Sequence, residues 1–62
     1  MYTITKISNS SSKKVVDVIE FNDKEFEKAS NAWNALIRSS EIKNLYISAI
    51  FKKDSVVIST VN

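Results

Sequence analysis

Apolar and polar residues follow two different periods along this chain. Four short stretches are rich in β-branched and aromatic residues and roughly alternate between apolar and polar, a pattern typical of strands. They span residues 2–8, 14–21, 45–51 and 56–61. The segments between the first two stretches and between the last two are short and polar, so they predict two hairpins.

Between the two hairpins, the residues predict a helix over 23–39. Asn22 is a suitable N-cap because its side-chain oxygen can accept a first-turn amide, and Glu25 can reach back to the amide of Asn22. Phe21 and Phe26 occupy the two positions of a hydrophobic staple. One apolar stripe recurs at helical spacing through Phe26, Ala29, Trp33, Leu36 and Ile37. A helix with this stripe would place the single tryptophan at the centre of the core.

The order strand-strand-helix-strand-strand predicts a single α+β domain over residues 1–62, a four-stranded antiparallel sheet with the helix packed on one face. A spatial strand order of 2-1-3-4 makes every pair antiparallel, whereas 2-1-4-3 places a parallel pair at the centre. The sequence does not choose between these orders. It also leaves open which face of the second and fourth strands packs on the helix. In the second strand, either choice turns Asp17 or Glu20 inward unless a bulge intervenes.

Composition narrows the chemistry available to a domain of this size. The 62 residues include no Cys and no His, which excludes disulfides, thiol chemistry and the usual zinc ligands and general base. They include no Gly, so a phosphate-cradling loop is absent, and no Pro, so turns depend on Asn, Asp and Ser. We therefore expect no cofactor and no enzymatic activity. A chain this short buries only about 60% of its unfolded surface, so association with another surface would add stability.

The net charge of +2 is a weak basic excess, with nine Lys and Arg against seven Asp and Glu. Two lysine pairs, Lys13-Lys14 and Lys52-Lys53, fall at the expected hairpin ends. If they converge at one end of the sheet, they form a modest phosphate-binding surface, so weak nucleic-acid binding is the alternative function. No signal peptide and no membrane span is visible, so the expected setting is the cytoplasm.

The strands alternate imperfectly, which points to a surface for another protein. If Leu45 and alternate residues up to Phe51 face the helix, then Tyr46 and Ile50 point away from it. The predicted interface on that side consists of Tyr46, Ile50, Val57 and Val61. Isolated surface apolar residues are also ordinary and need no function. A contiguous patch instead favours a protein–protein interaction module, with a second copy or another, unidentified protein as its partner.

In its size, its bias towards Ile, Lys, Asn and Ser, and its lack of motifs, the chain resembles the small proteins encoded by prophages of low-GC Gram-positive bacteria. The resemblance covers the whole chain but carries no motif, so it assigns no functional residue. It implies a stand-alone accessory protein that acts by binding and modulating another protein, which is the role that the residues indicate independently.

Overall fold

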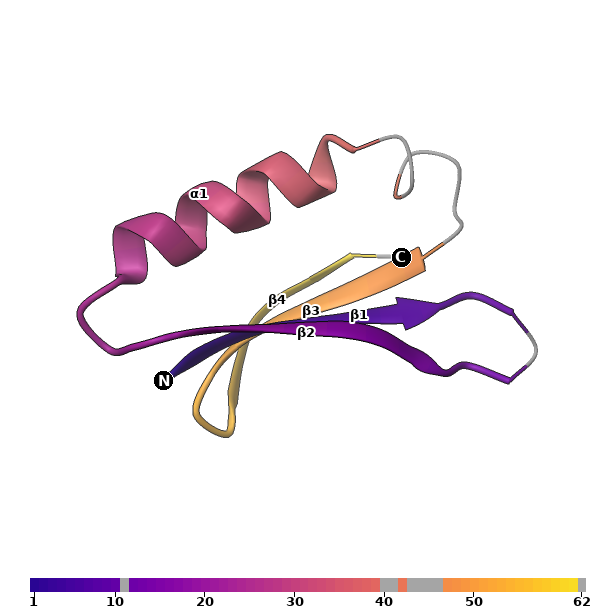
Figure 1. The fold of residues 1–62 in the computed structure, drawn as a ribbon, viewed down its shortest axis with the longest axis horizontal. Coiled ribbons are helices and arrows are strands. Elements are labelled where there is room, and N and C mark those ends of the chain that lie inside the picture. The colour runs from indigo at the N-terminus through magenta and orange to yellow at the C-terminus, as the bar shows by residue number, and fades with distance from the viewer. Residues whose placement is uncertain (11, 40–41, 43–46, 62) are drawn as a thin grey trace.

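Four strands form one antiparallel sheet in the order β2-β1-β3-β4, and one helix lies across it (Figure 1). The computed structural model describes residues 1–10, 12–39, 42 and 47–61. Its elements are β1 (Tyr2–Ser8), β2 (Val15–Phe21), α1 (Phe26–Ile37), β3 (Ile47–Lys53) and β4 (Val56–Val61). The predicted α+β architecture is therefore confirmed.

The pairing of β3 with β1 gives the strand order. In the sheet, Tyr2 of β1 lies opposite Phe21, where β2 ends, and Ser8 lies opposite Ile47, where β3 begins. Chain that leaves β2 at one end of the sheet is therefore carried back to the other end before β3 starts. From there β3 runs antiparallel to β1, as it would in either order, and it pairs with β1 directly, which gives the order 2-1-3-4 and not 2-1-4-3. In this order β2 and β4 are the two edges of the sheet.

The core lies between α1 and the two central strands. Trp33 of α1 is buried and stacks on Phe51 of β3, with ring centroids 5.5 Å apart. The ring centroid of Tyr2 lies 6.1 Å from that of Phe51 and 5.4 Å from that of Phe26. The buried residues are Tyr2, Ile4, Ala29, Trp33, Leu36, Ile42, Ile47, Ala49 and Phe51. The prediction that the tryptophan belongs to the core is confirmed, and the described part of each edge strand contributes no fully buried residue.

The helix begins later than predicted, at Phe26 rather than at residue 23. The two hydrogen bonds expected of the cap do form: the Asn22 side chain accepts from the amide of Lys24 at 2.9 Å, and the Asn22 amide donates to the Glu25 carboxylate at 3.1 Å. A side-chain bond to the residue two positions on makes an Asx turn, which bends the backbone before it becomes helical. Residues 22–25 are consequently a turn that precedes the helix, with Glu25 itself outside the helical region at φ −105° and ψ 32°.

Each hairpin connection contains a residue with positive φ. Glycine usually occupies such positions in tight turns, and because this chain has no glycine, another residue type takes each of them. Asp54, in the turn between β3 and β4, has φ 53°, and Lys13, in the loop between β1 and β2, has φ 51°. Aspartate tolerates this region comparatively well, which agrees with the expected reliance on polar turn residues. Lysine has no short side chain to compensate, so Lys13 is the strained position of the pair.

Each edge strand contains one irregularity, where a single residue is skipped in the pairing. In β2 the skipped residue is Val16, because Lys6 lies opposite Asp17 while Ile7 lies opposite Val15. In β4 it is Ile58, which is skipped between the partners of Phe51 and Lys52. A bulge of this kind reverses the alternation of side chains along the bulged strand relative to its partner.

Candidate functional site

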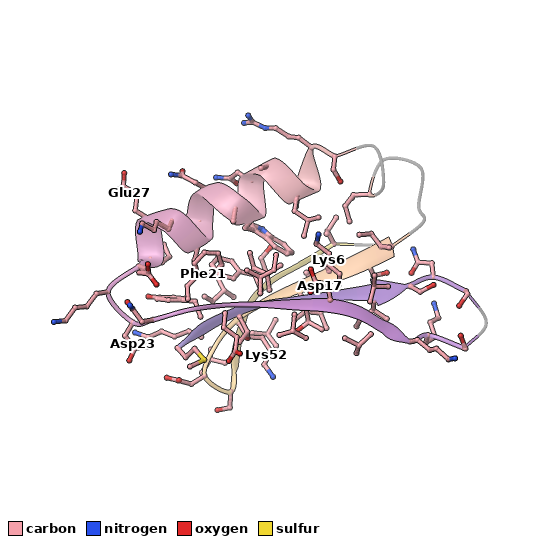
Figure 2. The ribbon with its side chains drawn as sticks, viewed as in Figure 1. Lys6, Asp17, Phe21, Asp23, Glu27 and Lys52 are labelled. Atoms are coloured by element: carbon pink, nitrogen blue, oxygen red, sulfur yellow. The ribbon has the colours of Figure 1, made fainter. Side chains whose placement is uncertain are left out.

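The face of the sheet turned away from α1 is the candidate site, and we call it the distal face. Directly opposite residues in neighbouring strands share a face, and residues adjacent along a strand lie on opposite faces. Because Ile4 and Phe51 are buried towards α1, their neighbours Thr3 and Lys52 belong to the distal face. Figure 2 shows Lys52 on the side of the sheet opposite the helix, whereas Phe21 lies on the helix side.

The register arranges the distal face in three rows across the strands. The first row contains Glu20, Thr3, Lys52 and Val57, in the order β2-β1-β3-β4. The second contains Val18, Thr5, Ile50 and Thr60, and the third Val15, Ile7 and Ser48. The face is therefore charged along one row and apolar or hydroxylated along the other two.

Apolar side chains on this face remain open to solvent. Val15 is 59% exposed, Val18 is 48% exposed and Val57 is 54% exposed. Ile7 and Ile50, on the two central strands, are half-buried by their neighbours. We call these five residues the apolar patch. Scattered apolar surface residues are common, whereas these five lie at neighbouring or diagonal positions across all four strands.

The four residues of the predicted interface divide into three groups. Ile50 and Val57 do lie on the distal face. Val61 does not, because it lies opposite Ala49 and packs against the core on the helix side. The bulge at Ile58 is the reason, since in an uninterrupted strand residues four apart share a face. Tyr46 lies outside the described residues.

Sequence reasoning missed Val15, Val18 and Ile7 as members of the patch. Val15 and Val18 are three residues apart, so regular alternation separates them, and only the bulge at Val16 brings them to one face. Asp17 alternates regularly with Ile19 and therefore lies on the helix side, where Figure 2 shows it near Lys6, its partner in β1. Asp17 remains exposed there, and its carboxylate accepts the amide of Val18 at 2.9 Å. The inward-turned charge did not signal this bulge, because the bulge lies before Asp17 and leaves Asp17 on the helix side.

Glu20 and Lys52 are the two charged residues in the three rows, and they flank Thr3 on either side. Within the described part of the chain, neither takes part in an ion pair. The distal face is thus electrically neutral as a whole, but one end carries a negative charge on its β2 side and a positive charge on its β3 side.

The two lysine pairs do not converge. Lys13 and Lys14 belong to the loop at the Ser8 end of β1, whereas Lys52 and Lys53 lie opposite Thr3 and Tyr2, at its other end (Figure 1). The longest dimension of the domain is 35 Å, so the pairs are separated by the length of the sheet. Lys53 also points to the helix side, with its ammonium 5.5 Å from the centre of the Tyr2 ring. The expected single phosphate-binding surface is therefore not formed by these four residues.

A cluster of charged groups lies at the same end of the sheet as Lys53. The amino group of Met1 donates to the carboxylates of Asp23, after β2, and Asp54, in the β3–β4 turn. These hydrogen bonds raise the pKa of the Met1 amine, and the bond to Asp23 has the larger effect. In turn, the amine lowers the pKa of Asp23. On the other side of the turn, the Asn22 amide and then Lys28 lower the pKa of Glu25. All these groups are at the surface. The Met1 amine joins the segment after β2 to the β3–β4 turn, which is a structural role, and we call its contact with Asp23 the tie.

The described residues hold no group of three or more acidic side chains placed to bind a metal ion, and no buried polar side chain. No helix in the described ranges is long and apolar enough to cross a membrane. The chain matches no protein-family model, no curated protein and no solved structure. The fold and the distal face together define its class, a small ββαββ domain whose helix covers one face of an antiparallel sheet.

Proposed function

We propose that this protein is a non-enzymatic protein–protein interaction module that docks through its distal face. The observation that supports this most directly is the exposure of the apolar patch, whose three valines on the edge strands are each about half or more open to solvent. The protein would act as an accessory or modulator, by occupying a surface of its partner. Such a role uses the features that the chain has and needs no reactive side chain.

The size of the domain makes burial of this face favourable. Full burial of a valine or isoleucine side chain is worth about 1.5–3 kcal/mol, so covering a half-exposed one contributes on the order of 1 kcal/mol. A 62-residue chain has a small margin of stability, of which a few such contributions are a substantial part. The patch is therefore a surface whose covering stabilises both the complex and the fold.

The area of the face sets the expected strength of the interaction. Four strands about 4.8 Å apart, with about six residues of 3.3 Å rise each, present roughly 400 Å² in projection. Stable complexes bury about 800 Å² on each partner, so this face offers about half of that area and is in the range of weak, transient complexes. We therefore expect an association that depends on concentration and is reversible.

Two adjacent valines of β4 provide a matched test. Val57 lies opposite Lys52 on the distal face, and Val56 lies opposite Lys53 on the helix side, while both are exposed. We would compare tagged wild type, Val57→Asp and Val56→Asp by pull-down from a bacterial lysate, with and without nuclease, and by their mass in solution. The expected result is association of the wild type and of Val56→Asp, and loss of association for Val57→Asp with unchanged circular dichroism.

The proposal fails if folded Val57→Asp associates as the wild type does. It also fails if the wild type is monomeric at all concentrations and retains no protein. Recovery of nucleic acid, or of proteins that are lost on nuclease treatment, would favour a nucleic-acid-binding function over the proposed one.

A further inference from the structure

We infer that the partner that covers the distal face is a second copy of this chain, packed face to face so that Glu20 of each copy pairs with Lys52 of the other. This inference rests on the proposed function and specifies its partner. The two copies would be related by a two-fold axis that runs parallel to the strands, midway between β1 and β3.

The strand order makes the charged row complementary to itself under this rotation. The axis places β2 of one copy over β4 of the other, and β1 over β3. In the first row, Thr3 then faces the second copy's Lys52, and Glu20 lies one strand spacing, about 5 Å, to the side of it. That offset is within reach of a glutamate and a lysine side chain, and the symmetry forms the pair twice. Both charges are free to do this, because within the described residues neither forms an ion pair in the single chain.

The apolar rows fit the same arrangement. In the second row, Val18 faces the second copy's Thr60, and Ile50 faces its Thr5. Val18 therefore meets a threonine of nearly the same shape, Ile50 meets a smaller threonine, and the valine and isoleucine side chains contact one another at the diagonal positions. The two Ile50–Thr5 pairs place a larger side chain opposite a smaller one, which allows the central strands of two sheets to approach closely.

The other two-fold arrangement is disfavoured by charge. An axis across the strands would place β2 over β2 and move Glu20 to the end of the second copy where Val15 lies. Glu20 would then come to the end of the second copy that carries Lys13 and Lys14, but Lys52 would be covered by the uncharged row that contains Ser48, without an acidic residue in that row. Covering an unpaired charge is costly, whereas pairing it across an interface is tolerated and fixes the register. Only the axis parallel to the strands gives both Glu20 and Lys52 an opposite charge, which favours that orientation of the second copy.

Charge reversal tests this geometry through the behaviour of mixtures. We would measure association by sedimentation and native mass spectrometry for the wild type, Glu20→Lys, Lys52→Glu, the double variant, and an equimolar mixture of the two single variants. Glu27→Lys serves as the control, because Glu27 is exposed on α1, away from the distal face (Figure 2). Circular dichroism establishes that each variant is folded.

Each single variant places like charges opposite each other twice, so its dimer dissociation constant should rise about tenfold or more. The double variant exchanges the charges and should associate as the wild type does. In the mixture, one chain carries lysine at both positions and the other carries glutamate at both, so mixed dimers should form in excess over either homodimer. The Glu27→Lys variant should associate like the wild type.

The outcomes separate this inference from the proposed function. A monomeric wild type that captures another protein, with capture lost in Val57→Asp, would overturn the second copy and leave the docking face in place. A wild-type dimer that neither single charge variant weakens would overturn the Glu20–Lys52 geometry. Preferential mixed dimers, together with recovery of association in the double variant, would establish this geometry. A substitution that acted only within its own chain would not favour a partner of opposite charge.

Discussion

Val57 and Val61 lie on opposite faces of the sheet although they are four residues apart on one strand. In an uninterrupted strand this spacing places two side chains on the same face. The bulge at Ile58 absorbs one residue, so Val57 stays on the distal face while Val61 packs against the core. One unpaired residue therefore decides which valine is available to a partner.

Deletion of Ile58 should leave both pairings intact. Without it, Val57 and Ser59 become adjacent and can remain opposite Lys52 and Phe51 in a regular ladder. We expect a folded protein with Val61 still in the core, and a change in unfolding free energy within about 1 kcal/mol, the range of ordinary edge-strand effects. Cross-strand nuclear Overhauser effects between strands β3 and β4 would measure the register. Deletion of Thr60 is the control, because it moves Val61 to the distal face and should destabilise the fold. Loss of folding on deletion of Ile58 would show that the bulge itself is required.

Replacement of Lys13 by glycine should stabilise the protein. Lys13 has φ 51°, a conformation that costs a residue with a Cβ atom about 1–2 kcal/mol and costs glycine nothing. Part of the gain is offset by the larger entropy of glycine in the unfolded chain, so the net increase in unfolding free energy should be about 0.5–1 kcal/mol. Urea denaturation followed by circular dichroism would measure it.

Lys14→Gly is the matched control for that substitution. It removes the same charge from the same loop, but Lys14 does not have positive φ and gains no relief. We expect Lys14→Gly to be neutral or destabilising. Equal effects of the two substitutions would mean that charge, not backbone conformation, determines the stability of this loop.

The tie between the Met1 amine and Asp23 should make stability depend on pH at both ends of the range. The pKa of the amine is raised above its ordinary 8.0, so its contribution is present below pH 8 and is lost as the pH rises through the raised value. The pKa of Asp23 is lowered from 3.8, so its contribution is present above pH 3.8 and is lost as the pH falls through the lowered value. The melting temperature of the wild type should therefore exceed that of Asp23→Asn most clearly between these limits.

Melting curves of both proteins across that range would test the tie. Because both groups are at the surface, added salt should reduce the difference between them. A difference that persists unchanged once the pH has passed well above the raised pKa of the amine, or at high salt, would assign the effect of Asp23 to something other than the amine.

The sequence alone determined the kinds of element, their order and the side of the helix that is buried. These follow from local properties, such as the apolar stripe that contains Trp33 and the alternation that leads to Phe51, and each is readable within one segment. The start of the helix was placed too early, because Asn22 and Glu25 make the same side-chain contacts in a turn as in a helix cap. The strand order depends on which strand of the second hairpin pairs with β1, and both hairpins are compatible with either choice.

Only the tertiary structure decided which residues make up the distal face. The side-chain period of a strand is two, so one skipped residue moves every later side chain to the other face. The bulges at Val16 and Ile58 do this in both edge strands, which brings Val15 to Val18 and separates Val61 from Val57. A bulge is set by pairing with the neighbouring strand and leaves little trace in the local sequence. The sequence therefore determined which apolar residues the strands contain. Contacts between segments far apart along the chain determined on which face of the sheet each of them lies.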